Sequence, residues 1–160
     1  MHYWIDGYNL LFYLPKTNES FEEKRRVLIS QINEQAKLLS LQSTIVFDAS
    51  DPSQKHDSRS HYDCLEIVYT HAKKTADDAI LEAVEFSRNR ANLCVVSSDK
   101  GLSLKAQALG AQILSLPEFL FFLFKKHKKK AFNQISEYQD SPKEIERLLK
   151  IFSKGPREEK

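Results

Sequence analysis

The segment Asn92-Leu93-Cys94-Val95-Val96-Ser97-Ser98-Asp99 is an apolar, strand-forming run that ends in an aspartate, and Lys100-Gly101 follows it. A second run, Ser43-Thr44-Ile45-Val46-Phe47-Asp48, has the same character and also ends in an aspartate. Continuous hydrophobicity over such a length is typical of a strand that is buried on both faces of a parallel sheet. These two segments therefore predict an α/β fold.

Shorter segments on either side of these runs complete the pattern. We predict further strands at residues 2–6, 65–69 and 111–116, the first of them stopping at a turn at Gly7. Apolar residues at helical spacing predict helices over about 22–40, from 76, over about 102–109, from 119, and after the capping motif at 141–144. Residues 49–62 lack periodicity and are predicted to form a long loop. Alternating strands and helices predict a mainly parallel central sheet with helices on both faces.

The composition is that of an ordinary soluble domain, with 160 residues, 41% hydrophobic and 29% charged. We expect one globular domain over residues 1–124 and a basic C-terminal segment over 125–160, whose terminal helix packs on the same domain. No apolar run approaches the roughly 20 residues of a membrane span, and the first residues do not resemble a signal peptide. Cys64 and Cys94 suit reduced, buried thiols. We therefore expect a cytoplasmic protein without membrane contact.

Charge is distributed unevenly along the chain. The formal net charge is only +2, but residues 121–160 contain 11 Lys and Arg against 6 Asp and Glu. Five of these lysines fall in the hexamer Lys125-Lys126-His127-Lys128-Lys129-Lys130. A basic segment attached to an acidic body suits an anionic partner, although such a run also suits the solvated end of a helix.

Acidic residues follow the predicted strands. Asp6, Asp48 and Asp99 each end a strand, and the pair Asp77-Asp78 begins a helix. In a parallel sheet the carboxyl ends of the strands share one edge, where ligands bind. Carboxylates gathered there repel one another, and Mg²⁺ or Mn²⁺ would relieve the repulsion with the oxygen ligands it prefers. Taken singly, each of these aspartates also suits a turn or a helix cap.

Other catalytic chemistries find little support. Four glycines and no Gly-rich loop leave no dinucleotide fingerprint or P-loop. There is no Gly-x-Ser-x-Gly elbow, and the five histidines are scattered. A phosphatase with an aspartyl nucleophile at Asp6 would want a second aspartate two residues later, where Tyr8 stands.

Four short motifs give the chain a recognisable character. They are Ile5-Asp6-Gly7-Tyr8-Asn9, Val46-Phe47-Asp48, Thr75-Ala76-Asp77-Asp78 and Val96-Ser97-Ser98-Asp99. With Gly110-Ala111, they resemble, in order, the motifs of the YacP-type NYN-domain ribonucleases, relatives of the PIN fold. The likeness extends from Met1 to about Phe124, and its opening motif is the most specific part.

This resemblance implies a PIN-like, three-layer α/β/α sandwich and divalent-metal-dependent endonuclease action on RNA. It implies that Asp6, Asp77 and Asp99 are the core acids, with Asp48 as a supporting metal ligand. Asn9 would orient a ligand or the scissile phosphate, and the Ser97 hydroxyl would hold Asp99. Asp78 would support the site as a helix cap. Relatives have been linked to messenger RNA and the ribosome, so these are implied partners.

Several cations are candidates for binding the RNA backbone, since phosphate contacts are made mainly by Lys and Arg. They are Arg59 in the predicted loop, Lys73, Lys74 and Lys100 near the acids, and Lys125, Lys126, Lys128, Lys129 and Lys130 in the basic hexamer. Tyr8, beside the acids, suits either stacking on a base or filling space under Asn9.

Two hypotheses follow. The first is a metal-dependent endoribonuclease, with Mg²⁺ or Mn²⁺ held by the aspartates. The second is a non-catalytic RNA- or ribosome-binding module on the same fold, in which the acids serve only turns and caps. The sequence leaves the RNA target, the number of metal ions and the oligomeric state open.

Overall fold

The computed structural model describes residues 1–14, 18–49 and 51–124. The basic hexamer and the predicted terminal helix, both in 125–160, lie outside the described residues. No helix in the described ranges is long and apolar enough to cross a membrane.

The centre of the molecule is a six-stranded sheet in the order β3-β4-β2-β1-β5-β6. Its strands are β1 His2–Asp6, β2 Gln42–Phe47, β3 Ser58–Tyr62, β4 Leu65–Tyr69, β5 Leu93–Val96 and β6 Gln112–Leu114. Every neighbouring pair is parallel except β3 and β4, which are antiparallel. The predicted mainly parallel sheet is therefore confirmed, with β1 near its middle.

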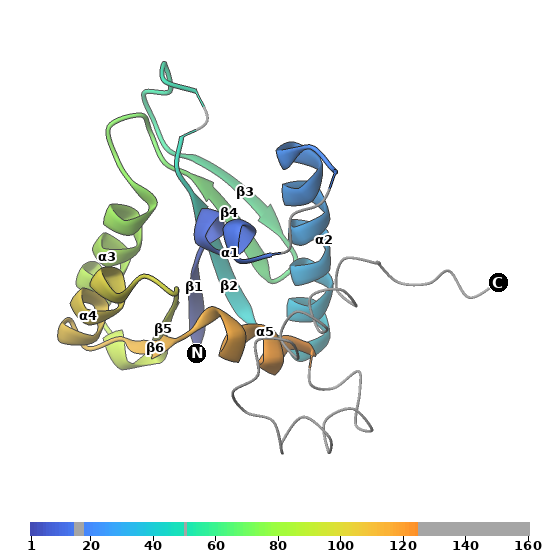
Figure 1. Cartoon of the computed structure of the whole chain (residues 1–160). Helices are drawn as coiled ribbons and strands as arrows, with labels where there is room; N and C mark the ends of the chain where they lie inside the picture. The colour runs from blue at the N-terminus through green and yellow to red at the C-terminus, as the bar shows by residue number, and fades with distance from the viewer. Residues whose placement is uncertain (15–17, 50, 125–160) are drawn as a thin grey trace.

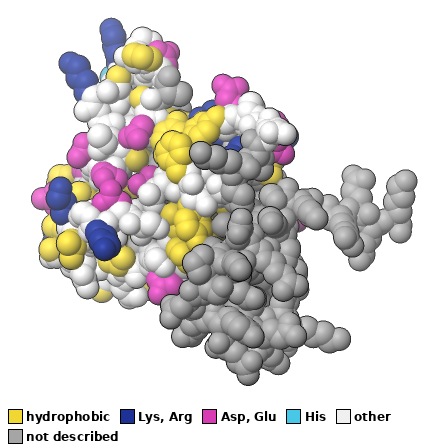
Figure 2. All heavy atoms as spheres, in the orientation of Figure 1, with side chains coloured by type: hydrophobic (Ala, Val, Ile, Leu, Met, Phe, Trp, Pro, Cys, Tyr) yellow, Lys and Arg dark blue, Asp and Glu magenta, His cyan; other side chains and the backbone are white. Residues whose placement is uncertain are grey.

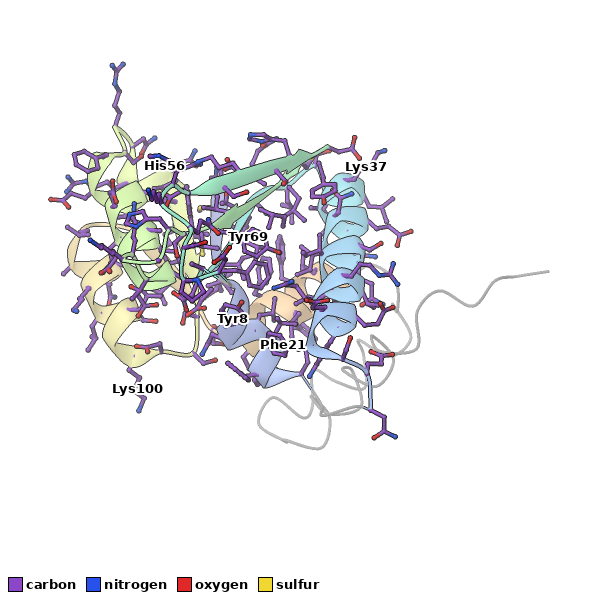
Figure 3. All side chains as sticks on the ribbon, turned by 90° about the horizontal axis from the view of Figure 1, so that it is seen from above. Tyr8, Phe21, Lys37, His56, Tyr69 and Lys100 are labelled. Atoms are coloured by element: carbon purple, nitrogen blue, oxygen red, sulfur yellow. The ribbon has the colours of Figure 1, made fainter. Side chains whose placement is uncertain are left out.

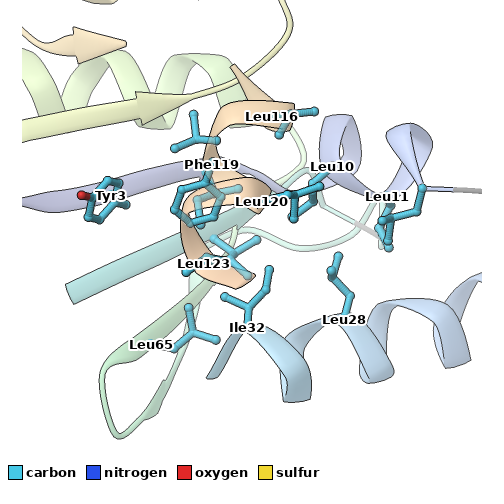
Figure 4. Close-up of a cluster of buried hydrophobic side chains, with 14 of the residues drawn as sticks. Tyr3, Leu10, Leu11, Leu28, Ile32, Leu65, Leu116, Phe119, Leu120 and Leu123 are labelled. Atoms are coloured by element: carbon cyan, nitrogen blue, oxygen red, sulfur yellow. The ribbon is translucent and has the colours of Figure 1, made fainter. Parts of the chain in front are cut away.

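Helices cover both faces of the sheet, which confirms the three-layer α/β/α arrangement (Figure 1). They are α1 Gly7–Tyr13, α2 Phe21–Leu39, α3 Ala76–Phe86, α4 Lys100–Ala108 and α5 Leu116–Phe124, with a short 3-10 turn at Arg90–Asn92. Two separate cores result. One lies between the sheet and α1, α2 and α5, and contains Leu10, Leu28 and Phe119 (Figure 4). The other lies between the sheet and α3 and α4, and contains Val46 and Ile80.

The structure differs from the sequence prediction in two places. Gly7 does not begin a turn but starts helix α1, because the Asp6 carboxylate accepts a hydrogen bond from the Asn9 N–H and caps the helix. The predicted loop 49–62 ends in the exposed edge strand β3. All five residues of β3 are exposed, so it pairs with β4 through its backbone without a hydrophobic pattern that sequence could show.

Gly7 is needed where α1 meets the sheet. It is buried, and a Cβ atom placed there would lie 2.8 Å from Cζ of Phe47 and nearer still to two other ring atoms. Phe47 is fully buried and cannot move aside cheaply. The absence of a side chain at Gly7 therefore lets α1 start directly against the end of β2.

We expect Gly7→Ala to destabilise the protein by about 1–3 kcal/mol, the usual cost of overpacking a core. Urea denaturation followed by circular dichroism measures the change. Gly101→Ala is the control, because Gly101 is exposed in α4 and its added Cβ meets only the Asp99 carboxylate, at 3.2 Å. Equal stabilities of Gly7→Ala and wild type would contradict the close packing of α1 on Phe47.

Candidate active site

Four aspartates surround the carboxyl ends of β1, β2 and β5, which we call the carboxyl edge. Asp6 is the last residue of β1, Asp48 follows β2, Asp77 is in the first turn of α3, and Asp99 immediately precedes α4. The other three act electrostatically on Asp6, so the fold brings together acids that the sequence places far apart. Figure 2 shows a group of acidic side chains on this face of the molecule.

Three of these carboxylates also bind backbone N–H groups at helix starts. Asp6 accepts from Asn9 at 3.2 Å and Asp99 from Leu102 at 2.9 Å. Asp48 accepts from the Ala76 N–H at 2.6 Å, across 28 residues of sequence, and so links the end of β2 to the start of α3. The capping interpretation of these acids is correct, but it does not explain why acids of different elements are close together.

The electrostatics of the carboxyl edge are unfavourable for negative charge. Burial, followed by the charges of Asp77, Asp48 and Asp99, raises the pKa of Asp6 to about 6, although the Asn9 hydrogen bond lowers it. The pKa of Asp77 is also raised, first by burial and then by Asp99 and Asp48. Lys105, on α4, is the cation that counteracts this shift at Asp77.

Asp78 has a different role from its neighbour Asp77. The Thr75 hydroxyl accepts from the Asp78 N–H at 3.1 Å, and the Asp78 carboxylate accepts from the Thr75 N–H at 3.3 Å. These two bonds form a capping box, and hydrogen bonding of the Asp78 carboxylate to the side chain and then the backbone of Thr75 lowers its pKa. The interpretation of Asp78 as a helix cap is confirmed.

Asn9 connects α1 to the segment between β5 and α4. Its side-chain carbonyl accepts from the Ser98 N–H at 2.8 Å and contacts the buried Ser97 hydroxyl at 3.4 Å. The Ser97 hydroxyl in turn accepts from the backbone N–H of Asp99 at 3.0 Å. Ser97 thus positions Asp99 through its backbone, and Asn9 braces the same segment from the opposite element.

The residue types at the carboxyl edge fit a hard divalent cation. Four carboxylates supply oxygen ligands, and in the described residues none of the four is in a salt bridge. As they stand, no three His, Cys, Asp or Glu side chains of the described residues are grouped tightly enough to hold one ion. The capping bonds explain this, since Asp6, Asp48 and Asp99 are directed at backbone N–H groups.

The predicted RNA-binding cations have varied surroundings. Lys73 and Lys100 are exposed, and Figure 3 shows Lys100 at the start of α4. Lys74 forms ion pairs with Asp57, at 3.7 Å, and with Glu82. Arg59 donates to Glu66 at 2.9 Å on the outer strands. Lys125, Lys126, Lys128, Lys129 and Lys130 lie outside the described residues.

Sequence reasoning missed two features near the acids. Lys105 follows Asp99 by six residues, and only the packing of α4 beside α3 gives it influence on Asp77. An aromatic group beside α1 also went unnoticed: Phe12 and Phe21 pack with Tyr8. The four-residue spacing of Tyr8 and Phe12 could have revealed it, had α1 been predicted.

The fold and the acidic edge define an α/β protein with a nuclease-type fold of the PIN-like class. The profile of the family described as "YacP-like NYN domain" matches residues 3–154. The chain therefore belongs to the YacP-like NYN domain family, as its motifs suggested.

Solved structures agree with this assignment. The crystal structure of Rae1 (YacP) from Bacillus subtilis is 24% identical, with a TM-score of 0.61, and the match covers 96% of this chain and 93% of that one. A point mutant of the same protein is 21% identical, with a TM-score of 0.64, and covers 93% and 90%. At these identities the likeness supports the fold. No curated protein sequence matches the chain.

We expect Asp6→Asn to stabilise the protein at neutral pH. The folded pKa of Asp6, about 6, lies above its ordinary value of 3.8, so its ionised form is costlier in the folded state. The penalty is absent below about pH 4 and complete above about pH 7. Asparagine keeps the helix cap, and because Asp6 is partly exposed we expect a gain of only about 1–2 kcal/mol.

The measurement is thermal or urea unfolding in EDTA at pH 4 and pH 7.5. The stability difference between Asp6→Asn and wild type should appear at pH 7.5 and shrink at pH 4. Asp78→Asn is the contrasting variant: the pKa of Asp78 is lowered, so its loss should destabilise the protein at pH 7.5. A gain for Asp6→Asn that is the same at both pH values would contradict the charge repulsion.

Proposed function

We propose that this protein is a divalent-metal-dependent endoribonuclease that hydrolyses phosphodiester bonds of RNA. The observation that supports this most is the mutual repulsion of Asp6, Asp77, Asp48 and Asp99 at the carboxyl edge. Maintaining like charges in a partly buried place costs stability, and functional sites are where such a cost is common. Membership of a family with a nuclease-type fold gives the site its reaction class.

In this proposal the core acids Asp6, Asp77 and Asp99 bind Mg²⁺ or Mn²⁺, and Asp48 supports them. The bound ion would activate a water and neutralise charge on the scissile phosphate. Asp99 keeps its place through the bonds of its backbone to Ser97 and of its carboxylate to Leu102. Asn9 holds the segment before α4 against α1, so that the acids of β1 and α4 stay aligned.

RNA is the proposed substrate, with messenger RNA on the ribosome as the proposed setting in the cytoplasm. The exposed Lys73 and Lys100 are proposed phosphate contacts, together with Lys74, Arg59 and the basic hexamer. These cations also suit the second candidate, a non-catalytic RNA- or ribosome-binding module. Repulsion among the four acids favours the enzyme, because a binding module for an anion gains nothing from it.

Asp77→Asn should lower the rate of RNA cleavage at least about 100-fold. This is the usual effect of removing a group that stabilises the charge developing in the transition state. The assay incubates structured and single-stranded RNAs with Mg²⁺, Mn²⁺ or EDTA and maps the new ends. Asp78→Asn is the matched control, since it removes the same charge one residue away and should leave cleavage near wild type. Asp6→Asn should behave as Asp77→Asn does. Cleavage by folded Asp77→Asn at the wild-type rate would refute the site.

Mn²⁺ should raise the melting temperature of wild type but not of Asp99→Asn, because ligands that bind only the folded state stabilise it. The same ion should remove the stability advantage of Asp6→Asn at pH 7.5, since it relieves the repulsion. Differential scanning fluorimetry with a Mn²⁺ titration measures both effects. Salt-sensitive RNA binding without a Mn²⁺ effect or cleavage would favour the binding module instead.

A further inference from the structure

Two aromatic side chains beside the carboxyl edge are exposed to solvent. Phe12 is 76% exposed and Phe21 is 41% exposed. They contact each other, with ring centroids 5.9 Å apart, and both contact Tyr8, at 6.4 and 5.6 Å. Large apolar rings that gather on a surface mark a binding site more often than a single exposed ring does. Figure 2 shows a hydrophobic patch beside the acidic side chains on this face.

The three rings are held by the local structure. Tyr8 and Phe12 are four residues apart on α1, and so lie on the same side of that helix. Phe21 is the first residue of α2, where the Ser20 hydroxyl accepts from the Glu23 N–H and caps the helix. Tyr8 rests edge-on against the buried Phe47 ring, with centroids 5.2 Å apart, and stacks on Phe21. The rings therefore form a preorganised surface, which we call the aromatic platform: Tyr8, Phe12 and Phe21.

The platform adjoins the proposed catalytic acids. Asp6 caps α1, the helix that carries Tyr8 and Phe12. Side chains alternate between the faces of a strand, so Phe47 faces α1 and α2 while Val46 faces α3 and α4. Asp48, Asp77 and Asp99 lie around the starts of α3 and α4, on the other side of the sheet's edge from the platform, and Asp6 lies between the two groups at the end of β1. Figure 3 shows Tyr8, Phe21 and Tyr69 together on the α1–α2 side.

A cation lies beside the platform. The Arg25 guanidinium is 5.9 Å from the Phe47 ring centroid and 5.4 Å from that of Tyr69. Tyr69 stacks on Phe47, which in turn contacts Tyr8, so the guanidinium and the platform belong to one continuous aromatic group. Exposed rings next to a partly buried guanidinium combine stacking surface with attraction for phosphate, the pairing used for single-stranded nucleic acids.

We infer that the aromatic platform stacks an unpaired base of single-stranded RNA whose neighbouring phosphate lies at the acids. This inference rests on the proposed nuclease function and adds a substrate feature to it: the RNA must be unpaired next to the cleavage position. Phe12 and Phe21 offer the exposed faces, Tyr8 supports them, and Arg25 attracts the backbone. A duplex keeps its bases stacked on one another and cannot use the platform.

Phe12→Ala is the test, and Phe86→Ala is its matched control. Phe86 is also 76% exposed, but it lies at the far end of α3 and makes no ring contact among the described residues. We measure the affinity of the full-length chain for a fluorescently labelled single-stranded RNA by anisotropy in EDTA, where no cleavage interferes. Phe12→Ala should bind about tenfold more weakly, Phe86→Ala should bind like wild type, and Phe12→Trp should keep its affinity.

An RNA with one abasic nucleotide separates stacking from loss of apolar surface. The abasic position is moved along the RNA. At one position wild type should bind the abasic RNA about tenfold more weakly than intact RNA, whereas Phe12→Ala should bind both RNAs equally. Duplex RNA should bind wild type and Phe12→Ala equally. If Phe12→Ala binds more weakly than wild type by the same factor on intact RNA and on every abasic RNA, the platform does not stack a base and the inference is overturned.

The same variants separate the other outcomes. Unchanged RNA affinity in Phe12→Ala, together with a dimer in sedimentation that this variant dissociates, would assign the platform to a second copy and overturn the inference. If wild type cuts RNA with Mn²⁺ but Phe12→Ala binds RNA with wild-type affinity, the proposed base stacking on the platform is wrong and the proposed nuclease function stands. If no RNA is cut, the nuclease is wrong, and the binding data in EDTA still decide the platform.

Discussion

The parallel pairing of β1 with both β2 and β5 is the constraint on which the rest of the structure depends. Its register places Asp6 opposite Val46, and Ile5 opposite Val96. The acids that follow these strands therefore reach the same edge, although up to 93 residues of sequence separate them. Hydrophobic burial on both faces holds this register, and the carboxylates that meet at the shared edge repel one another as a result.

Three of the four acids at that edge also hold the start of a helix. Asp6 and Asp99 cap the helices that follow them, and Asp48 binds the first N–H of α3. Helix starts carry partial positive charge, which makes a crowded set of carboxylates tolerable without an ion pair. The same bonds direct three of the carboxylates at backbone N–H groups, so the proposed metal would have to draw these side chains together.

The carboxyl edge has two chemically different sides because strand residues alternate between faces. Asp6 follows Ile5, and Asp48 follows Phe47, so an acid and an apolar side chain lie next to each other at the end of each strand. The acidic side is completed by α3 and α4, and the aromatic side by α1 and α2. In the proposed function, a substrate that crosses the edge would meet a metal ion held by the carboxylates at its phosphate, and rings at its base.

The sequence by itself determined the α/β class, the buried strands and the acids at their ends, because continuous apolar runs and their abrupt polar endings are local signals. It also determined the Thr75–Asp78 cap. Only the tertiary structure decided what non-local contacts control: α1 in place of a turn, the exposed strand β3, the effect of Lys105 on Asp77, and the bond of Asp48 to the start of α3. The effect of Lys105 on Asp77 and the bond of Asp48 to α3 depend on a partner far away in the chain. Strand β3 is fully exposed and pairs through its backbone, so it has no hydrophobic period, and α1 begins at once against the buried Phe47 ring of another strand. Asp6 has properties of both kinds. Its place at a strand end is visible in the sequence, whereas its pKa is raised only when folding buries it and brings Asp77, Asp48 and Asp99 close to it.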